Sequence, residues 1–206
     1  MAEGGFRRGA ISQILFFISA LLLSLSYLIA ASIGFLEDVM LSFASYVFLL
    51  IFGTVFTTAN NDLIARFGGS RVGLTASIVG ILTSLVGLIA YFILPIFPIL
   101  LISLIALSMD HLAFGGTAIL TGAFFLKYRE YLQNKGSWGL TGLIYIIAGF
   151  ALFISAARLF LPVFLSYLAV GYLLLLVAIV GIMGAICLLV AKPIESTGEK
   201  ELTADH

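Results

Sequence analysis

The amino-acid sequence predicts an all-α fold, a polytopic membrane bundle of six transmembrane helices. Of its 206 residues, 62% are hydrophobic and only 10% are charged, whereas soluble domains are about half apolar and about a quarter charged. A soluble domain of this length would still leave about a third of its chain surface in water, so lipid must surround much of this chain. The apolar residues also form six long runs, each bounded by charges, prolines or polar turns.

The first three runs are long enough for helices that span the hydrocarbon core, which need about 20 mostly apolar residues. The first run stops at Glu37-Asp38, and the second stops at Asn60-Asn61-Asp62. The third begins after Arg71 and ends at Pro95. The first three predicted spans therefore cover about residues 10–36, 39–59 and 72–95.

The other three runs follow the same logic. Pro98 opens the fourth span, which continues to about Leu126, and the fifth lies between Trp138 and Pro162. The sixth ends before Lys192, so the last three predicted spans cover about residues 98–126, 138–162 and 163–191. We expect one transmembrane domain over residues 1–192. The polar residues 193–206 should form a disordered cytoplasmic tail, because they offer almost no apolar surface to bury.

The distribution of Lys and Arg predicts the orientation, because these residues concentrate on the cytoplasmic side of membrane proteins. With the N-terminus inside, nine of the ten basic residues fall in the cytoplasm and Arg158 lies toward the other side. The nine are Arg7, Arg8, Arg66, Arg71, Lys127, Arg129, Lys135, Lys192 and Lys200. We therefore expect both ends in the cytoplasm and a location in the cell membrane. Tyr128, Tyr131 and Trp138 flank one cytoplasmic loop and predict an aromatic belt at the headgroups.

Two short matches suggest an internal repeat. Gly73-Leu74-Thr75 opens the third span, and Gly139-Leu140-Thr141 opens the fifth, 66 residues later. Leu94-Pro95 and Leu161-Pro162 close the same two spans, 67 residues apart. These offsets match the length of one two-helix hairpin, so three tandem hairpins could fill the chain. Coincidence explains the matches equally well in a sequence so rich in Gly and Leu.

Small residues at four-residue spacing let helix backbones approach closely in lipid. The third span carries such a stripe, formed by Ala76, Gly80, Ser84, Gly87 and Ala90. The sixth span has Gly181 and Gly184-Ala185. We expect these faces to pack either within the bundle or against another subunit.

The fourth span contains the unusual pair Asp110-His111. At about 1.5 Å of rise per residue from Pro98, Asp110 lies about a third of the way across from the outer face. A charge inside the membrane costs at least about 2.5 kcal/mol and persists mostly where it faces protein or water.

The helical neighbours of this pair predict that both side chains point into protein. The face of Asp110 is small and polar, and consists of Ser103, Ala106, Asp110, Ala113, Thr117 and Thr121. The adjacent face of His111 also holds small residues, namely Ser108, His111, Gly115, Ala118 and Gly122. The opposite face is apolar and should meet lipid through Leu101, Ile105, Leu112 and Ile119.

Asp110, His111 and Arg158 are the candidate site residues. Consecutive residues on a helix diverge, so Asp110 and His111 do not aim at one point. Arg158 enters the membrane from the same outer side and could reach Asp110, or could extend to the headgroups. We weigh two interpretations of Asp110, a buried polar clamp between helices and a proton or ion site.

No catalytic, metal or nucleotide motif accompanies these residues, so the sequence predicts neither an enzyme nor a cofactor site. A single cysteine and two histidines, one of them terminal, exclude a His/Cys zinc site and a haem held by two histidines of this chain. The balance of ten basic and ten acidic residues gives no indication of nucleic-acid binding.

Two functions fit the sequence. The first is a non-catalytic integral membrane subunit of a larger assembly, in contact with lipid and with other subunits or with itself through the small-residue faces. The alternative is a small homo-oligomeric transporter or channel that uses Asp110 as a proton or ion coupling site.

Overall fold

The computed structural model describes residues 2–33, 39–68, 71–93, 109–156 and 163–194. Within these ranges nearly all of the chain is helical. The elements are, in chain order, α1 (Ala2–Ile33), α2 (Val39–Phe67), α3 (Val72–Ile93), the π-helical turn η1 (His111–Gly116), α5 (Thr117–Tyr128), the 3-10 turn η2 (Arg129–Tyr131), α6 (Lys135–Ala156) and α7 (Val163–Leu189).

Five of the described helices are long and apolar enough to cross a membrane. The spanning segments are Gly4–Ser32, Val39–Phe67, Val72–Ile93, Lys135–Ser155 and Tyr167–Leu189. This agrees with the predicted all-α membrane bundle. The fourth predicted span is described only from Met109 onward, as η1 and α5. Its outer half lies outside the described residues.

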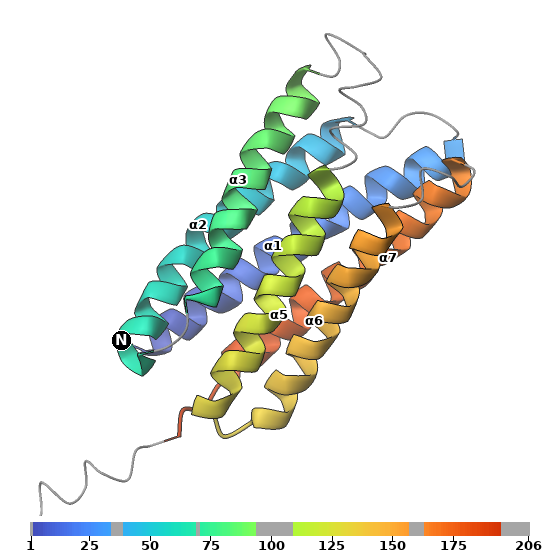
Figure 1. Cartoon of the computed structure of the whole chain (residues 1–206). Helices are drawn as coiled ribbons and strands as arrows, with labels where there is room; N and C mark the ends of the chain where they lie inside the picture. Colours follow the sequence, from blue (N-terminus) through green and yellow to red (C-terminus); the bar gives the residue numbers. More distant parts are fainter. Residues whose placement is uncertain (1, 34–38, 69–70, 94–108, 157–162, 195–206) are drawn as a thin grey trace, which may run out of the picture.

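The helices are arranged as a closed ring (Figure 1). Each of α1, α2, α3, α5 and α6 packs on the helix that follows it, and α7 returns to pack on α1. Large aromatic side chains fill the interior, with Phe16 of α1 against Phe52 of α2 at a ring-centroid distance of 5.0 Å. Further along the bundle, the rings of Phe125 and Trp138 lie 4.9 Å apart. These ring contacts form an aromatic core inside the bundle.

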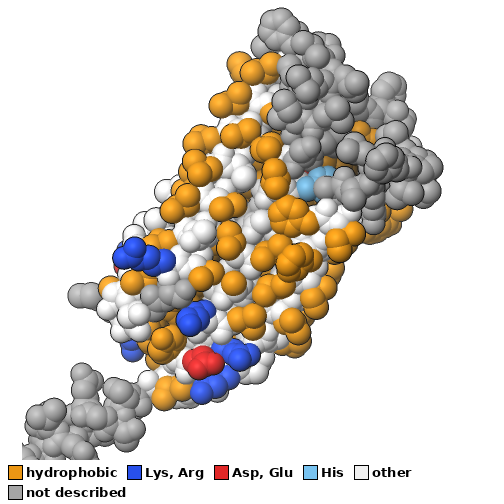
Figure 2. Space-filling model, viewed as in Figure 1, with side chains coloured by type: hydrophobic (Ala, Val, Ile, Leu, Met, Phe, Trp, Pro, Cys, Tyr) orange, Lys and Arg blue, Asp and Glu red, His pale blue; other side chains and the backbone are white. Residues whose placement is uncertain are grey.

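Apolar side chains cover the outside of the ring as well. In α3 the exposed residues include Ile78, Leu82, Leu85, Val86, Ile89 and Phe92. In α6 they include Leu140, Leu143, Ile147, Phe150 and Ile154. Figure 2 shows apolar side chains spread over one face of the bundle. Apolar surface on both sides of a helix is the pattern of a protein whose surroundings are lipid.

Glycine pairs bring the fourth predicted span close to α6. A Cβ atom added at Gly122 would lie 2.5 Å from the carbonyl oxygen of Gly142, and one added at Gly142 would lie 2.7 Å from that of Gly122. Gly115 and Gly149 repeat this arrangement two turns away, at 3.1 and 2.7 Å. The two backbones are in direct contact at both places, which any side chain would prevent.

The predicted small-residue faces both pack inside the chain. Gly87 of α3 lies against the ring of Tyr46 in α2. Gly181 of α7 lies against the backbone of Phe17 in α1, where an added Cβ would be 3.2 Å from the Phe17 Cα atom. Each of the two faces therefore serves a contact between helices of the same chain.

The second predicted span, which stops at Asn60-Asn61-Asp62, is the first part of a longer helix, because α2 continues through these residues to Phe67. The Asn60 side-chain amide donates a hydrogen bond of 2.7 Å to the Phe56 carbonyl oxygen of its own helix. Asp62 forms an ion pair of 2.9 Å with Arg8. Polar residues that find partners in this way need not interrupt a helix.

The predicted aromatic belt was wrong for two of its three residues. The side chains of Trp138 and Tyr128 are fully buried, and Tyr131 is half-buried. The indole of Trp138 packs against Phe125, and the Tyr128 ring packs 4.7 Å from that of Phe124. These aromatic side chains lie beside the loop where the sequence places them, but they point inward. The interior of the helix bundle offers them a larger apolar surface.

All described Lys and Arg residues lie at one end of the bundle, which we call the basic end (Figure 2). The chain after α7 is held at this end. The backbone N–H of Gln133 donates to the Lys192 carbonyl oxygen at 2.9 Å. The backbone N–H of Ile194 donates to the Tyr131 carbonyl oxygen at 3.0 Å. The predicted disordered tail falls on residues 195–206, which lie outside the described residues.

Candidate functional site

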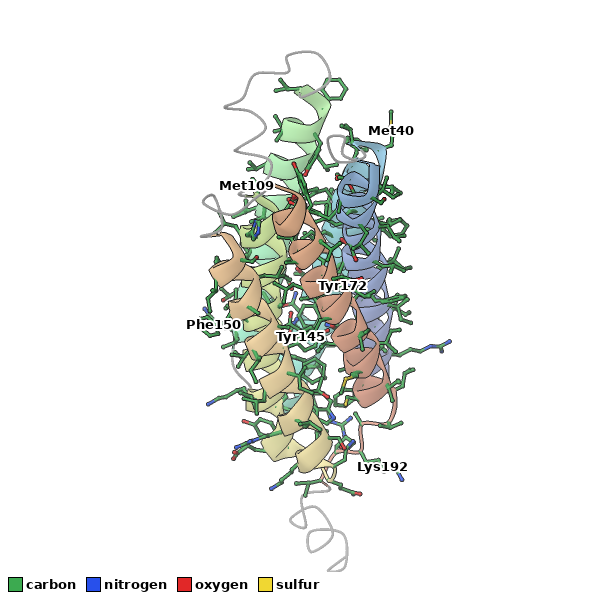
Figure 3. All side chains as sticks on the ribbon, turned by 90° about the vertical axis from the view of Figure 1, so that its right-hand side faces the viewer. Met40, Met109, Tyr145, Phe150, Tyr172 and Lys192 are labelled. Atoms are coloured by element: carbon green, nitrogen blue, oxygen red, sulfur yellow. The ribbon has the colours of Figure 1, made fainter. Side chains whose placement is uncertain are left out.

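Asp110 lies deep in the bundle, far from the basic end. It directly precedes η1, and its side chain is 1% exposed. Figure 3 shows its neighbour Met109 toward one end of the molecule and Lys192 at the other. The carboxylate therefore lies inside the bundle and is surrounded by protein.

Three tyrosines from three helices bind the Asp110 carboxylate. The hydroxyl of Tyr27 in α1 donates to Oδ2 at 2.7 Å, and that of Tyr91 in α3 donates to the same oxygen at 2.9 Å. The hydroxyl of Tyr46 in α2 donates to Oδ1 at 2.7 Å. We call this group the tyrosine cage. It joins the fourth predicted span to α1, α2 and α3 through one side chain.

Local packing positions the cage. Gly87 leaves room for the Tyr46 ring to lie against α3, and this ring is 5.7 Å from that of Tyr91. On the other side, the rings of Tyr27 and Tyr167 are 5.6 Å apart. Each of the three cage tyrosines is buried, with an exposed fraction of 1% or less. Their phenol oxygens are thus held in place by the rings that carry them.

The hydrogen-bond pattern matches an ionised carboxylate. Such a group accepts on both oxygens and donates nothing, and here Oδ2 accepts two bonds and Oδ1 accepts one. Bonds to a charged acceptor are about twice as strong as those between neutral groups. Phenol donors therefore supply, inside the membrane region, part of the solvation that water would give the charge.

The described donors to the Asp110 carboxylate are the three tyrosines. His111 is buried, with 8% of its side chain exposed. It begins η1, the turn that packs against both α6 and α3. Arg158, the predicted partner of Asp110, lies outside the described residues. Among the described residues, no Lys or Arg forms an ion pair with Asp110.

Sequence analysis missed the three cage tyrosines. The available signal was a tyrosine within each of the first three apolar runs, since a buried phenol normally needs a hydrogen-bond partner. Spacing along the chain could not have identified that partner. Tyr27 and Asp110 are 83 residues apart in the sequence.

A second polar contact lies in the interior nearer the basic end. The Tyr145 hydroxyl donates to the side-chain oxygen of Gln13, which connects α6 with α1. Close by, the Thr141 hydroxyl lies 3.2 Å from the sulfur of Cys187 in α7. These contacts join neighbouring helices of the ring. Within the part of the chain that the structure describes, no three His, Cys, Asp or Glu residues are grouped to bind a metal.

Comparison with known proteins finds no protein-family model, curated protein or solved structure that matches this chain. The functional argument therefore depends on the geometry of Asp110 and its surroundings.

Proposed function

We propose that the chain is a non-catalytic integral membrane subunit of a larger assembly. It would be a six-span scaffold in the cell membrane with both ends in the cytoplasm. The tyrosine cage is the observation that supports this most. Asp110 is bound by three helices of its own chain, which suits a clamp that stiffens the bundle.

The packing of the helices suggests where partners would bind. Both small-residue faces are occupied within the chain, so we assign the partner contact to the exposed apolar faces of α3 and α6, around Leu82 and Ile147. The grouping of basic residues at one end supports the cytoplasmic placement of that end. The ring order is compatible with three tandem hairpins, α1–α2, α3–α5 and α6–α7.

The first experiment is gentle extraction from the native membrane, followed by native-gel separation and mass spectrometry of the band that contains this chain. A subunit should migrate with other proteins in a fixed ratio. Migration alone or as a homo-oligomer, together with solute flux by the isolated protein in liposomes, would contradict the proposal.

Homo-oligomeric transport with Asp110 as a proton or ion coupling site is the second candidate. It is favoured by the carboxylate itself, because ionisable residues inside membranes commonly serve ion or proton pathways. It is also favoured by η1, since π-helical turns are frequent at functional sites.

Replacement of Asp110 distinguishes the two candidates. Asp110→Asn keeps the size but makes one acceptor oxygen an NH2 group, which cannot accept the hydrogen bonds of the cage. A clamp predicts lower thermal stability and loss of partners, whereas a coupling site predicts normal assembly without pH-dependent flux. Asp62→Asn is the matched control, because its ion pair with Arg8 lies at the partly exposed basic end.

A further inference from the structure

Several buried polar atoms lie between Asp110 and the basic end without a hydrogen-bond partner among the described residues. They include the hydroxyls of Thr117, Thr121 and Tyr128 and the side-chain oxygen of Asn60. Each of these residues is 1% exposed or less. Buried polar atoms without a protein partner are uncommon, and they usually bind an internal water molecule.

The two threonines depart from the pattern of the others. Thr54, Thr57 and Thr83 donate to carbonyl oxygens of their own helices at 2.7–2.9 Å, which is the usual way for a threonine in a membrane helix to satisfy its hydroxyl. Thr117 and Thr121 make no such bond. Their hydroxyls are therefore available to another partner.

The residues that carry these atoms follow one another along the bundle. Thr117 and Thr121 are four residues apart and share a face of α5. The hydroxyl of Thr117 is 3.7 Å from the Cβ position of Gly80 in α3, and Asn60 of α2 lies against Gly73, about two turns closer to the basic end. Tyr128 ends α5 beyond them.

The rise of the helices gives the order and the spacing. At about 1.5 Å per residue, Thr121 is about 6 Å beyond Thr117 in α5, and Thr117 is at most about 10 Å from Asp110 along the axis, since the π-helical turn η1 between them rises less per residue. Asn60 and Tyr128 follow at intervals of about 4–6 Å. With hydrogen-bonded oxygen atoms about 2.8 Å apart, one or two water molecules would span a step of about 4–6 Å, and up to about three would span the step from Asp110 to Thr117.

We propose that a file of water molecules follows Thr117, Thr121, Asn60 and Tyr128 and connects the Asp110 carboxylate with the aqueous phase at the basic end. Water in this file can deliver a proton to the carboxylate and return one by the same route. The cage tyrosines of α1, α2 and α3 are the titratable groups that bind the carboxylate. The file does not depend on the proposed subunit function, since either a scaffold or a transporter can contain it.

Thiol accessibility tests the file in the full chain, reconstituted in lipid. In a Cys187→Ala background, Thr117→Cys and Thr121→Cys place single thiols on the file, and Ala118→Cys is the matched control. Ala118 is also fully buried, on the same helix, but on another face. The probe is silver ion, small enough to follow single-file water. After exposure to silver the protein is unfolded and treated with a maleimide. The fraction of thiols that no longer reacts with the maleimide measures silver binding.

The thiols on the file should bind silver roughly tenfold faster or more than the control, because metals bind the thiolate, which needs water to form. Equal and slow reaction of all three thiols would overturn the proposal.

The melting temperature is a second measurement, which tests the file even if the cysteine variants fold poorly. Thr121→Val should leave the melting temperature unchanged or lower it, as should Thr57→Val, whose hydroxyl has a partner. A higher melting temperature for Thr121→Val would mean that the hydroxyl is dry, and would also overturn the file.

Discussion

At the scale of single residues, the stability of a charge in this bundle depends on its donors. Asp110 is almost completely buried, yet three phenol hydroxyls are within 2.9 Å of its oxygens. A buried carboxylate without such donors would cost several kcal/mol, whereas a bonded one can serve as a link between helices. The tyrosines are therefore as important to this position as the acid.

Removal of one donor should destabilise the bundle measurably. Tyr46→Phe leaves Oδ1 of Asp110 without the bond from Tyr46. We expect a loss of about 1–2 kcal/mol in the free energy of unfolding, which lies between typical values for bonds to charged groups and those between membrane helices. Chemical unfolding in detergent measures this loss. Tyr172→Phe is the control, because that ring is 57% exposed and outside the cage. Equal stability of the two variants would show that the Tyr46 bond adds nothing.

At the scale of elements, close approach of backbones decides how the fourth predicted span packs on α6. Gly115 faces Gly149, and Gly122 faces Gly142, so the two backbones come into contact at two places where glycine meets glycine. The His111 side of the span is used for this contact, and the Asp110 side is turned toward the cage. One helix thus carries a packing face and a polar face side by side.

A side chain at one glycine pair should separate these helices. Gly142→Val would force a Cβ atom to within 2.7 Å of the Gly122 carbonyl oxygen, and backbone cannot move aside as a flexible side chain can. We expect a loss of about 1–3 kcal/mol, the usual cost of overpacking, seen as a lower melting temperature. Gly136→Ala is the control, since a Cβ at Gly136 meets nothing within 4 Å. A melting temperature equal to that of the control would rule out tight contact at this pair.

At the scale of the whole molecule, charge and apolar surface are segregated along and around the bundle. The described basic residues gather at one end, and exposed apolar side chains cover the flanks (Figure 2). This distribution fits a protein that crosses a bilayer with its basic end in the cytoplasm. The packed aromatic interior, in turn, ties the ring of helices together from within.

Cysteine labelling measures the orientation directly. Single cysteines at Gly4 and Gly136, both exposed near the basic end, should resist a membrane-impermeant maleimide in intact cells and react after the membrane is opened. Met40 is 78% exposed at the start of α2, so Met40→Cys should react from outside. Labelling of Gly4→Cys in intact cells would reverse the proposed orientation.

The sequence by itself determined the class of the protein and the approximate limits of its helices, because membrane helices must satisfy their backbone groups internally and expose apolar side chains to lipid. It also indicated that Asp110 and His111 lie within protein. Only the tertiary structure decided what Asp110 binds. The cage brings together Tyr27, Tyr46 and Tyr91 from distant segments, and no local pattern records such a meeting. The same reason explains the error at Trp138, whose aromatic character suggested an interface, whereas rings on other helices made it part of the interior.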